Sequence, residues 1–240
     1  MRVQRYVLRM HITLDFLLCK SVKKGQKNMK YAELNHIWKR IFEAEWESVC
    51  HKSKAIAAVI VDENGEIISE GRNKTGEVII PNPRVNHAEV EAVRNLDIGK
   101  YPYVKSYTLY AALEPCPMCL GTLVMGGIRK IVIGARDDHG GAVELLDKSS
   151  FLASKHIEVK WMPQIYGDIQ RGLQSIKELL YNEDKEKLEI MLKDFSVCNG
   201  RGVRAARNMI NDGWFEHKAP DQYAIEVIFD RLCELIESYG

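Results

Sequence analysis

The 240-residue chain lacks any uninterrupted apolar run of the roughly 18 residues that a membrane helix needs. It also lacks the small-residue cleavage site that follows a secretory signal, although residues 1–18 combine arginines with apolar residues. Its six cysteines do not have the spacing of a disulfide framework, and no internal repeat or low-complexity segment is present. We therefore expect a cytoplasmic protein without a membrane segment.

The net charge of the chain is small, but the charges are unevenly distributed. Residues 1–30 carry eight Lys or Arg against Asp15 alone, a net +7, whereas the whole chain is +1, so residues 31–240 sum to −6. A basic arm can bind nucleic acid, can be a poorly ordered tail, or can lie upstream of a true start at Met29, and the sequence leaves these readings open. The acidic remainder argues against a polyanion as the main ligand.

Between residues 31 and 181, predicted helices and strands alternate. Apolar spacing predicts helices over 31–50, from about 86 onward and over 166–180, and Pro115 and Pro117 predict a further helix that begins about there and runs to Met125. Short apolar runs predict strands over 55–61, 66–72, 105–113, 130–135 and 157–162, the first two joined by a hairpin turn at 62–65. This alternation predicts an α/β fold with a three-layer α/β/α sandwich over residues 31–181.

Residues 182–240 show only helical patterning. We expect three helices, near 188–195, 203–210 and 224–236, with Gly200 and Gly202 separating the first two. This segment is predicted to be a helical C-terminal extension that covers the site, pairs with another subunit or adds bulk.

Two short motifs carry chemistry: His87-Ala88-Glu89 and Pro115-Cys116-Pro117-Met118-Cys119. His87, Cys116 and Cys119 are three good Zn²⁺ ligands, and three ligands leave one tetrahedral position open, as in catalytic rather than structural sites. The prolines predict that a helix begins near Cys116, and a helix N-terminus favours the thiolate that zinc requires. Water on such a zinc loses a proton near neutral pH, and Glu89 is placed to move protons.

Each motif alone has a simpler explanation. A lone C-x-x-C is also found in redox pairs and in half of a structural zinc site, and a lone H-x-E is common on helix faces. Here both occur in order, and the 25 residues between Glu89 and Pro115 accommodate a helix, a turn and a strand. The combination predicts a zinc site at which the ligands converge.

The pattern H-x-E followed by P-C-x-x-C resembles the signature of the zinc-dependent cytidine and deoxycytidylate deaminase superfamily. The runs Leu113–Cys119 and Ile133–Asp137 are most similar to the branch of tRNA adenosine deaminases and guanine deaminases. The resemblance implies zinc on His87, Cys116 and Cys119, a five-stranded mixed sheet, and usually a homodimer. It also implies Glu89 as the catalytic proton shuttle and Asn73 and Ala88 as substrate contacts.

The sequence thus predicts a hydrolase that acts on the C–N bond of a cyclic amidine in a nucleobase, nucleoside or nucleotide. The acidic domain favours a free small molecule from nucleoside metabolism. One alternative is adenosine-to-inosine deamination of tRNA, and another is a non-catalytic, zinc-stabilised interaction module. Asp137 and His139, in the loop after the fourth strand, are either substrate contacts or simply solvated.

Overall fold

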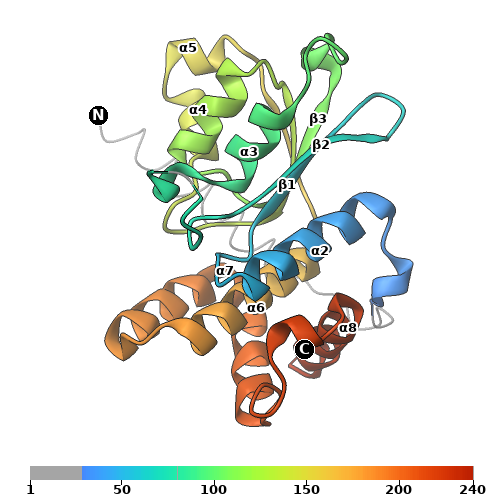
Figure 1. The fold of residues 1–240 in the computed structure, drawn as a ribbon. Coiled ribbons are helices and arrows are strands. Elements are labelled where there is room, and N and C mark those ends of the chain that lie inside the picture. The colour runs from blue at the N-terminus through green and yellow to red at the C-terminus, as the bar shows by residue number, and fades with distance from the viewer. Residues whose placement is uncertain (1–28, 80, 240) are drawn as a thin grey trace.

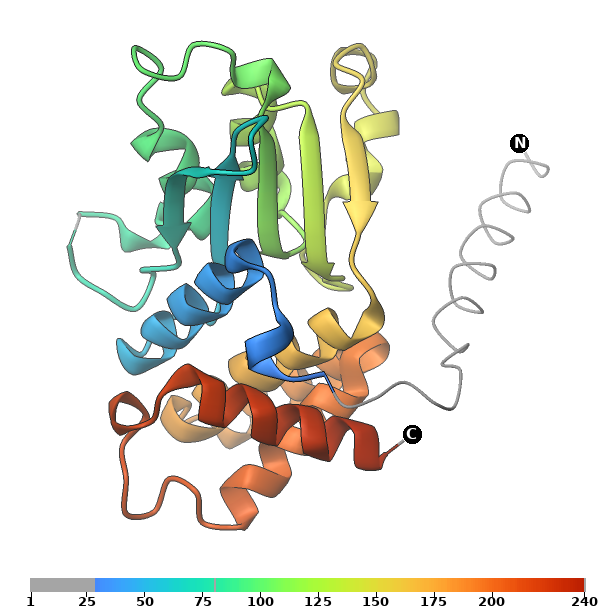
Figure 2. The same cartoon turned by 90° about the vertical axis from the view of Figure 1, so that its right-hand side faces the viewer.

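A five-stranded mixed sheet forms the centre of the computed structural model, which describes residues 29–79 and 81–239 (Figures 1 and 2). The strands follow the spatial order β2-β1-β3-β4-β5. β1 is antiparallel to β2 and β3, whereas β3, β4 and β5 are parallel to one another. The strands are β1 (Ala57–Val61), β2 (Ile67–Arg72), β3 (Thr108–Leu113), β4 (Lys130–Ala135) and β5 (Glu158–Trp161).

Helices cover both faces of this sheet. α3 (Ala88–Asn95), α4 (Pro117–Met125) and α5 (Ser150–Ala153) lie on one face, and α2 (His36–Cys50) and α6 (Gln164–Tyr181) on the other. α7 (Lys185–Asn211) and α8 (Ile225–Ser238) pack against α6 on its side away from the sheet (Figure 2). Short 3₁₀ helices span Tyr31–Glu33, Pro83–Val85, Val104–Ser106, Val143–Asp147 and Pro220–Gln222. The predicted three-layer fold with a five-stranded mixed sheet is confirmed.

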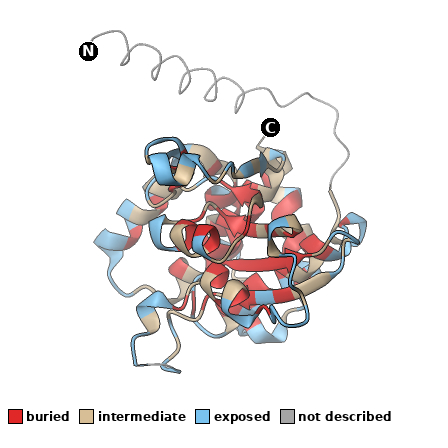
Figure 3. Ribbon diagram, turned by 90° about the horizontal axis from the view of Figure 1, so that it is seen from above, coloured by how far each residue is buried: buried red, intermediate tan, exposed pale blue. Residues whose placement is uncertain are grey.

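Alternating side chains of β1 explain why both faces of the sheet are covered. All five residues of β1 are buried: Ala57, Val59 and Val61 pack with α2, α6 and α8, while Ala58 and Ile60 pack with α3 and α4. Buried residues accordingly concentrate in the sheet and on the helix faces turned toward it (Figure 3). A strand that is apolar on both sides belongs in the middle of a sandwich.

The first predicted helix begins later than its apolar spacing indicated. Residues 31–33 form a 3₁₀ turn, and α2 begins at His36 because Asn35 adopts an extended conformation and its side chain accepts the amide of Trp38. This is the N-cap role that asparagine fills well. The hairpin turn at 62–65 is confirmed, with Gly65 at φ +87° and the Asp62 carboxylate accepting the amides of Asn64 and Glu66.

The predicted break between two helices at Gly200 and Gly202 is present as a kink one residue earlier, at Asn199. α7 runs from Lys185 to Asn211 with one non-helical residue inside it, Asn199. Gly202 also serves packing, because a Cβ there would lie 1.8 Å from the backbone oxygen of Asp168 in α6. Gly202 therefore allows the backbones of α6 and α7 to approach closely.

Two further predictions concern the basic N-terminal arm and the absence of a membrane segment. The basic arm of residues 1–30 falls outside the described residues except for Met29 and Lys30. Among the helices of the described chain, none has both the length and the apolar character to cross a membrane.

Candidate metal centre

The N-terminal ends of α3 and α4 bring the three predicted ligands together. His87 is the N-cap residue of α3 and Cys116 that of α4, and Cys119 lies in the first turn of α4. Both helices follow strand ends at the same edge of the sheet. Pro117 occupies the first position of α4, where the absence of an amide hydrogen costs nothing. The predicted placement of the cysteines at a helix N-terminus is confirmed.

The distances among these atoms match a tetrahedral zinc site. Nδ1 of His87 lies 3.7 Å from Sγ of Cys116 and 3.4 Å from Sγ of Cys119, and the two sulfurs are 3.5 Å apart. A tetrahedral zinc with Zn–S of about 2.3 Å and Zn–N of about 2.0–2.1 Å separates its ligand atoms by about 3.5–3.8 Å. In the described residues this is the only group of three or more such side chains close enough to hold a metal ion. The donor set therefore fits zinc.

The thiols interact with one another as a proton-sharing pair. The pKa of Cys116 falls to about 4, first because the Cys119 thiol donates a hydrogen bond to its sulfur and further because His87 lies beside it. The same hydrogen bond, together with burial, raises the pKa of Cys119. The pKa of His87 is raised mainly by its contact with Cys116. One thiolate is thus already favoured before a metal is bound, and it lies at the positive end of α4.

Glu89 lies next to this ligand cluster without being part of it. Its side chain is 3% exposed, and Oε2 lies 3.3 Å from Sγ of Cys119. Burial raises the pKa of Glu89 to about 6. A carboxyl in such a position can take up and release a proton near neutral pH, which general acid–base catalysis requires.

Asn73 presents an unpaired amide donor near the ligand segment. Its side-chain oxygen accepts the amide and the hydroxyl of Thr75, at 3.1 and 2.7 Å, whereas its Nδ2 is buried and has no partner in the described residues. The amide of Lys74 donates to the backbone oxygen of Asn86, which brings Asn73 to the segment that delivers His87. A buried donor without a partner is costly, so it is a candidate for binding a ligand.

Ala88 and Asn86 flank the histidine ligand. Ala88 is fully buried at the contact between β2 and α3. The two elements approach closely there, since a Cβ on Gly71 of β2 would lie 2.3 Å from the Ala88 backbone oxygen. Asn86 was not identified from the sequence, yet its Nδ2 is also buried and unpaired in the part of the chain that the structure describes. Nothing local distinguishes this asparagine from an ordinary loop residue, so no sequence signal would have singled it out.

The loop of residues 136–142 lies beside the cysteine ligands. Glu114 accepts the amides of Asp137 and Val143 at 3.2 and 3.1 Å, and the amide of Ala142 donates to the backbone oxygen of Pro115 at 3.0 Å. Both acceptors directly precede Cys116. The His139 side chain is 84% exposed, whereas Asp137 forms an ion pair with buried Arg171. Asp137 is thus part of the contacts that hold the loop beside the cysteine ligands, whereas the His139 side chain is exposed to solvent.

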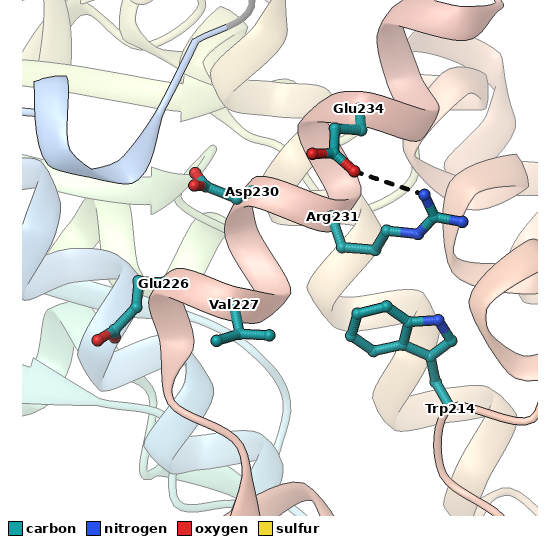
Figure 4. Close-up of a pocket in the computed structure, with 6 residues that line it drawn as sticks. All are labelled: Trp214, Glu226, Val227, Asp230, Arg231 and Glu234. Atoms are coloured by element: carbon teal, nitrogen blue, oxygen red, sulfur yellow. Dashed lines mark hydrogen bonds and ion pairs between the residues drawn. The ribbon is translucent and has the colours of Figure 1, made fainter.

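A pocket of about 440 Å³ lies elsewhere, on the C-terminal extension. Trp214 and side chains of α8 form its walls, and none of its lining residues belongs to the ligand cluster (Figure 4). Arg231 forms an ion pair with Glu234 there and lies over the Trp214 ring. The pocket lies apart from the candidate metal centre, which α3 and α4 form on the other side of the sheet.

The comparisons with known proteins agree with this geometry. Residues 24–135 match the family model described as the cytidine and deoxycytidylate deaminase zinc-binding region. A tRNA-specific adenosine deaminase of Haemophilus influenzae is 40% identical over 90 residues, 37% of this chain and 50% of that protein. A tRNA(Ile)-lysidine synthase of Deinococcus radiodurans is 36% identical over 118 residues, 49% of this chain and 19% of that protein.

A solved structure from a study of A-to-I editing by tRNA:A34 deaminases aligns with a TM-score of 0.45 and 25% identity, over 53% of this chain and 97% of that one. The chain thus spans at most half the length of the two curated relatives. The segment that matches the family model contains both motifs and all three candidate ligands. Residues 24–135 are therefore similar to the zinc-binding region of the cytidine and deoxycytidylate deaminases.

Proposed function

We propose that this chain is a zinc-dependent hydrolytic deaminase of a nucleobase, nucleoside or nucleotide, with His87, Cys116 and Cys119 as zinc ligands. The observation that carries the proposal is the position of Glu89, buried and 3.3 Å from a ligand sulfur but outside the three-ligand set. A closed structural site needs a fourth ligand and has no use for a protonatable carboxyl beside it. Both features favour catalysis over a zinc-stabilised interaction module.

The side chains around the centre account for binding and proton transfer. When bound, zinc supplies an acidified water that serves as the nucleophile at the amine-bearing ring carbon. Glu89 takes both protons of the attacking water in turn, one as the C–O bond forms and one as the C–N bond breaks, and delivers one to a ring nitrogen and one to the amine. The amine leaves as ammonia and the ring keeps the oxygen. The unpaired Nδ2 of Asn73 donates a hydrogen bond to an acceptor on the substrate. Ala88, the first residue of α3, is proposed as a further substrate contact, as the family resemblance implies.

The substrate is a free small molecule in this proposal. Residues 31–240 carry a net charge of −6, which disfavours a polyanionic ligand. The second candidate is adenosine-to-inosine deamination of tRNA, which the names of several relatives favour, with the basic residues of 1–30 holding the RNA. We also propose a cytoplasmic homodimer active in nucleoside metabolism, as the family resemblance implies, and light scattering in solution tests the dimer.

Ammonia release from a substrate panel tests the activity. The panel contains cytosine, cytidine, deoxycytidylate, adenosine, guanine, related pterin or triazine rings and a tRNA anticodon stem. Release from one free compound supports the first candidate. Release only from the RNA, with binding that weakens steeply as salt rises, replaces it with the second. A zinc-loaded chain that releases no ammonia from any member contradicts both and favours the interaction module.

A further inference from the structure

One face of α7, a helix of the C-terminal extension, contacts several residues of the loop 136–142. Nδ2 of Asn199 donates to the backbone oxygen of Arg136 at 3.3 Å, and Sγ of Cys198 lies 3.1 Å from a carboxylate oxygen of Asp138. One turn earlier, Asp194 lies 3.8 Å from the ring of His139. Residues 194, 195, 198 and 199 share one side of a helix, so the contacts form one continuous surface.

Phe195, the fourth residue of this face, contacts the loop indirectly, through Arg171. The ring of Phe195 lies 4.3 Å beneath the guanidinium of Arg171, which is 3% exposed and is paired with Asp137 at 2.9 Å. The same Asp137 carboxylate oxygen accepts the amides of His139 and Gly140 at 3.3 and 3.2 Å. Phe195 therefore supports the cation that fixes the centre of the loop.

The opposite side of the loop is attached to the chain that delivers Cys116. Glu114 holds the amides of Asp137 and Val143, and Pro115 accepts the amide of Ala142. Gly141 packs directly on this carboxylate, since a Cβ there would lie 2.4 Å from Cδ of Glu114. A continuous set of contacts thus runs from α7 through Arg171 and the loop to the residue preceding a zinc ligand.

The backbone conformation of Asn199 breaks the helix and allows its side chain to contact the loop 136–142. Asn199 is 2% exposed and has φ −125° and ψ 38°, which interrupts α7. Its side-chain oxygen accepts Nε2 of Gln164 at the start of α6, while its Nδ2 reaches the loop. The interruption of the helix lets one side chain join α6, α7 and the loop.

We propose that Phe195 and Asn199 are positioning residues for the metal centre, and that the C-terminal extension is part of the catalytic unit. The catalytic consequence rests on the proposed deaminase function, whereas the structural consequence does not. Without these contacts the loop 136–142 opens more often, and the segment Glu114–Cys116 loses its support. The metal is then held less tightly and less uniformly.

The test compares three variants of the full chain. Phe195→Leu keeps an apolar side chain but removes the ring beneath Arg171, Phe195→Tyr restores the ring, and Val197→Ala changes an exposed residue of the same helix turn as a control. Asn199→Ala is a second, independent disruption. Thermal unfolding verifies that each variant is folded.

Two measurements decide the outcome, and neither needs a substrate. Hydrogen exchange at the amides of Gly141, Ala142 and Val143 becomes about threefold to thirtyfold faster in Phe195→Leu, the range that a lost cation–π contact produces. The Co²⁺ dissociation constant, read from the thiolate-to-cobalt absorption band, rises about tenfold, the lower end of the effect of losing a supporting contact. Phe195→Tyr and Val197→Ala match the unmodified chain in both measurements.

Unchanged exchange in both Phe195→Leu and Asn199→Ala overturns the proposal. Faster exchange with unchanged Co²⁺ affinity also overturns it, because the loop then does not support the ligand segment. If the unmodified chain releases no ammonia from any substrate, the proposed function fails, while exchange and cobalt binding still decide this proposal.

Discussion

Two groups of polar side chains lie on opposite faces of the sheet, and they differ in whether their atoms have partners. In the ligand cluster of His87, Cys116 and Cys119, every donor atom lies within 3.7 Å of another. In the second group, which we call the helix-layer cluster, Glu45 of α2 meets Gln170 of α6, with Gln174 and Ser175 on the next turn. The helix-layer cluster is almost fully shielded from solvent, whereas in the ligand cluster only Cys119 is buried and His87 and Cys116 are partly exposed.

The helix-layer cluster is poorly satisfied. Both carboxylate oxygens of Glu45, the side-chain oxygens of Gln170 and Gln174, and the hydroxyl of Ser175 have no hydrogen-bond partner among the described residues. Gln170 lies beside Glu45 without hydrogen-bonding geometry, and its Nε2 donates to the backbone oxygen of Ala55 at 2.8 Å. Buried polar atoms without partners cost stability, whereas the ligand cluster gains its partners from each other and from a metal. The comparison predicts that the ligand cluster is required for metal binding, whereas the polar groups of the helix-layer cluster are not required for stability.

Removal of a ligand gives the largest expected effect. Cys119→Ser replaces a soft thiolate by a hydroxyl that binds zinc poorly. We expect zinc affinity to fall by more than about 100-fold, since loss of a contact that merely supports a ligand already costs about 10–100-fold. Competition with a chromogenic chelator measures it, and Cys50→Ser, a cysteine outside the cluster, is the control. Stoichiometric, tightly held zinc in Cys119→Ser would remove this residue from the ligand set.

Glu89→Gln comes next, because it changes the chemistry and not the metal. The amide keeps the size of the side chain but cannot carry a proton, so turnover should fall by about 10²–10⁴-fold while zinc stays bound. Ammonia release and zinc content are measured on the same preparation. Glu45→Gln is the matched control, the same change at a buried glutamate on the other face of the sheet. Near-normal turnover in Glu89→Gln contradicts the assignment of the proton shuttle.

The sequence predicted the ligand cluster well because zinc chemistry requires particular residue types at short spacing. The two motifs fixed His87, Cys116 and Cys119, and Pro117 fixed the helix start that brings the cysteines together. The alternation of apolar runs likewise predicted all five strands to within about three residues at each end. These features depend on local patterns that one sequence displays.

The rest depends on contacts between distant segments. Gln170 reads as one polar residue in an amphipathic helix, and only packing places it between Glu45 and Ala55. Asn199 directly precedes the two glycines that predicted a helix break, and the kink lies at Asn199 itself, where its side chain contacts Gln164 and Arg136. The substrate roles of Glu89 and Asn73 and the boundary at residues 181–182 stay predictions.

The pH dependence of stability distinguishes the two clusters more sharply. Burial raises the pKa of Glu45 well above its usual value, against the opposing influence of Gln170 and Arg171. The folded chain therefore keeps a proton that the unfolded chain releases above about pH 4.3. The unfolding free energy then falls as pH rises, by up to about 1.4 kcal/mol per pH unit from this group. Glu45→Gln has no such proton and loses this slope.

Urea unfolding of both chains at about pH 5 and about pH 7 checks this expectation, since carboxyl titration at other sites cancels in the difference. Glu45→Gln should gain stability relative to the unmodified chain at the higher pH. Parallel pH profiles would show that Glu45 is ionised in the folded state and has a partner there, and the contrast between the clusters would disappear.

Ser175→Ala gives the smallest effect and tests the comparison most directly. The Ser175 side chain is fully buried, and its hydroxyl has no partner in the described residues, so its removal breaks no hydrogen bond. Deleting a buried polar group without a partner should leave the unfolding free energy unchanged or raise it by up to about 1 kcal/mol. Ser69→Ala is the matched control, because the Ser69 hydroxyl donates to the backbone oxygen of Ala92 at 2.6 Å and its loss should destabilise the chain. If Ser175→Ala destabilises as much as Ser69→Ala, the helix-layer cluster is satisfied by internal water and is as necessary to the fold as the ligand cluster is to the metal.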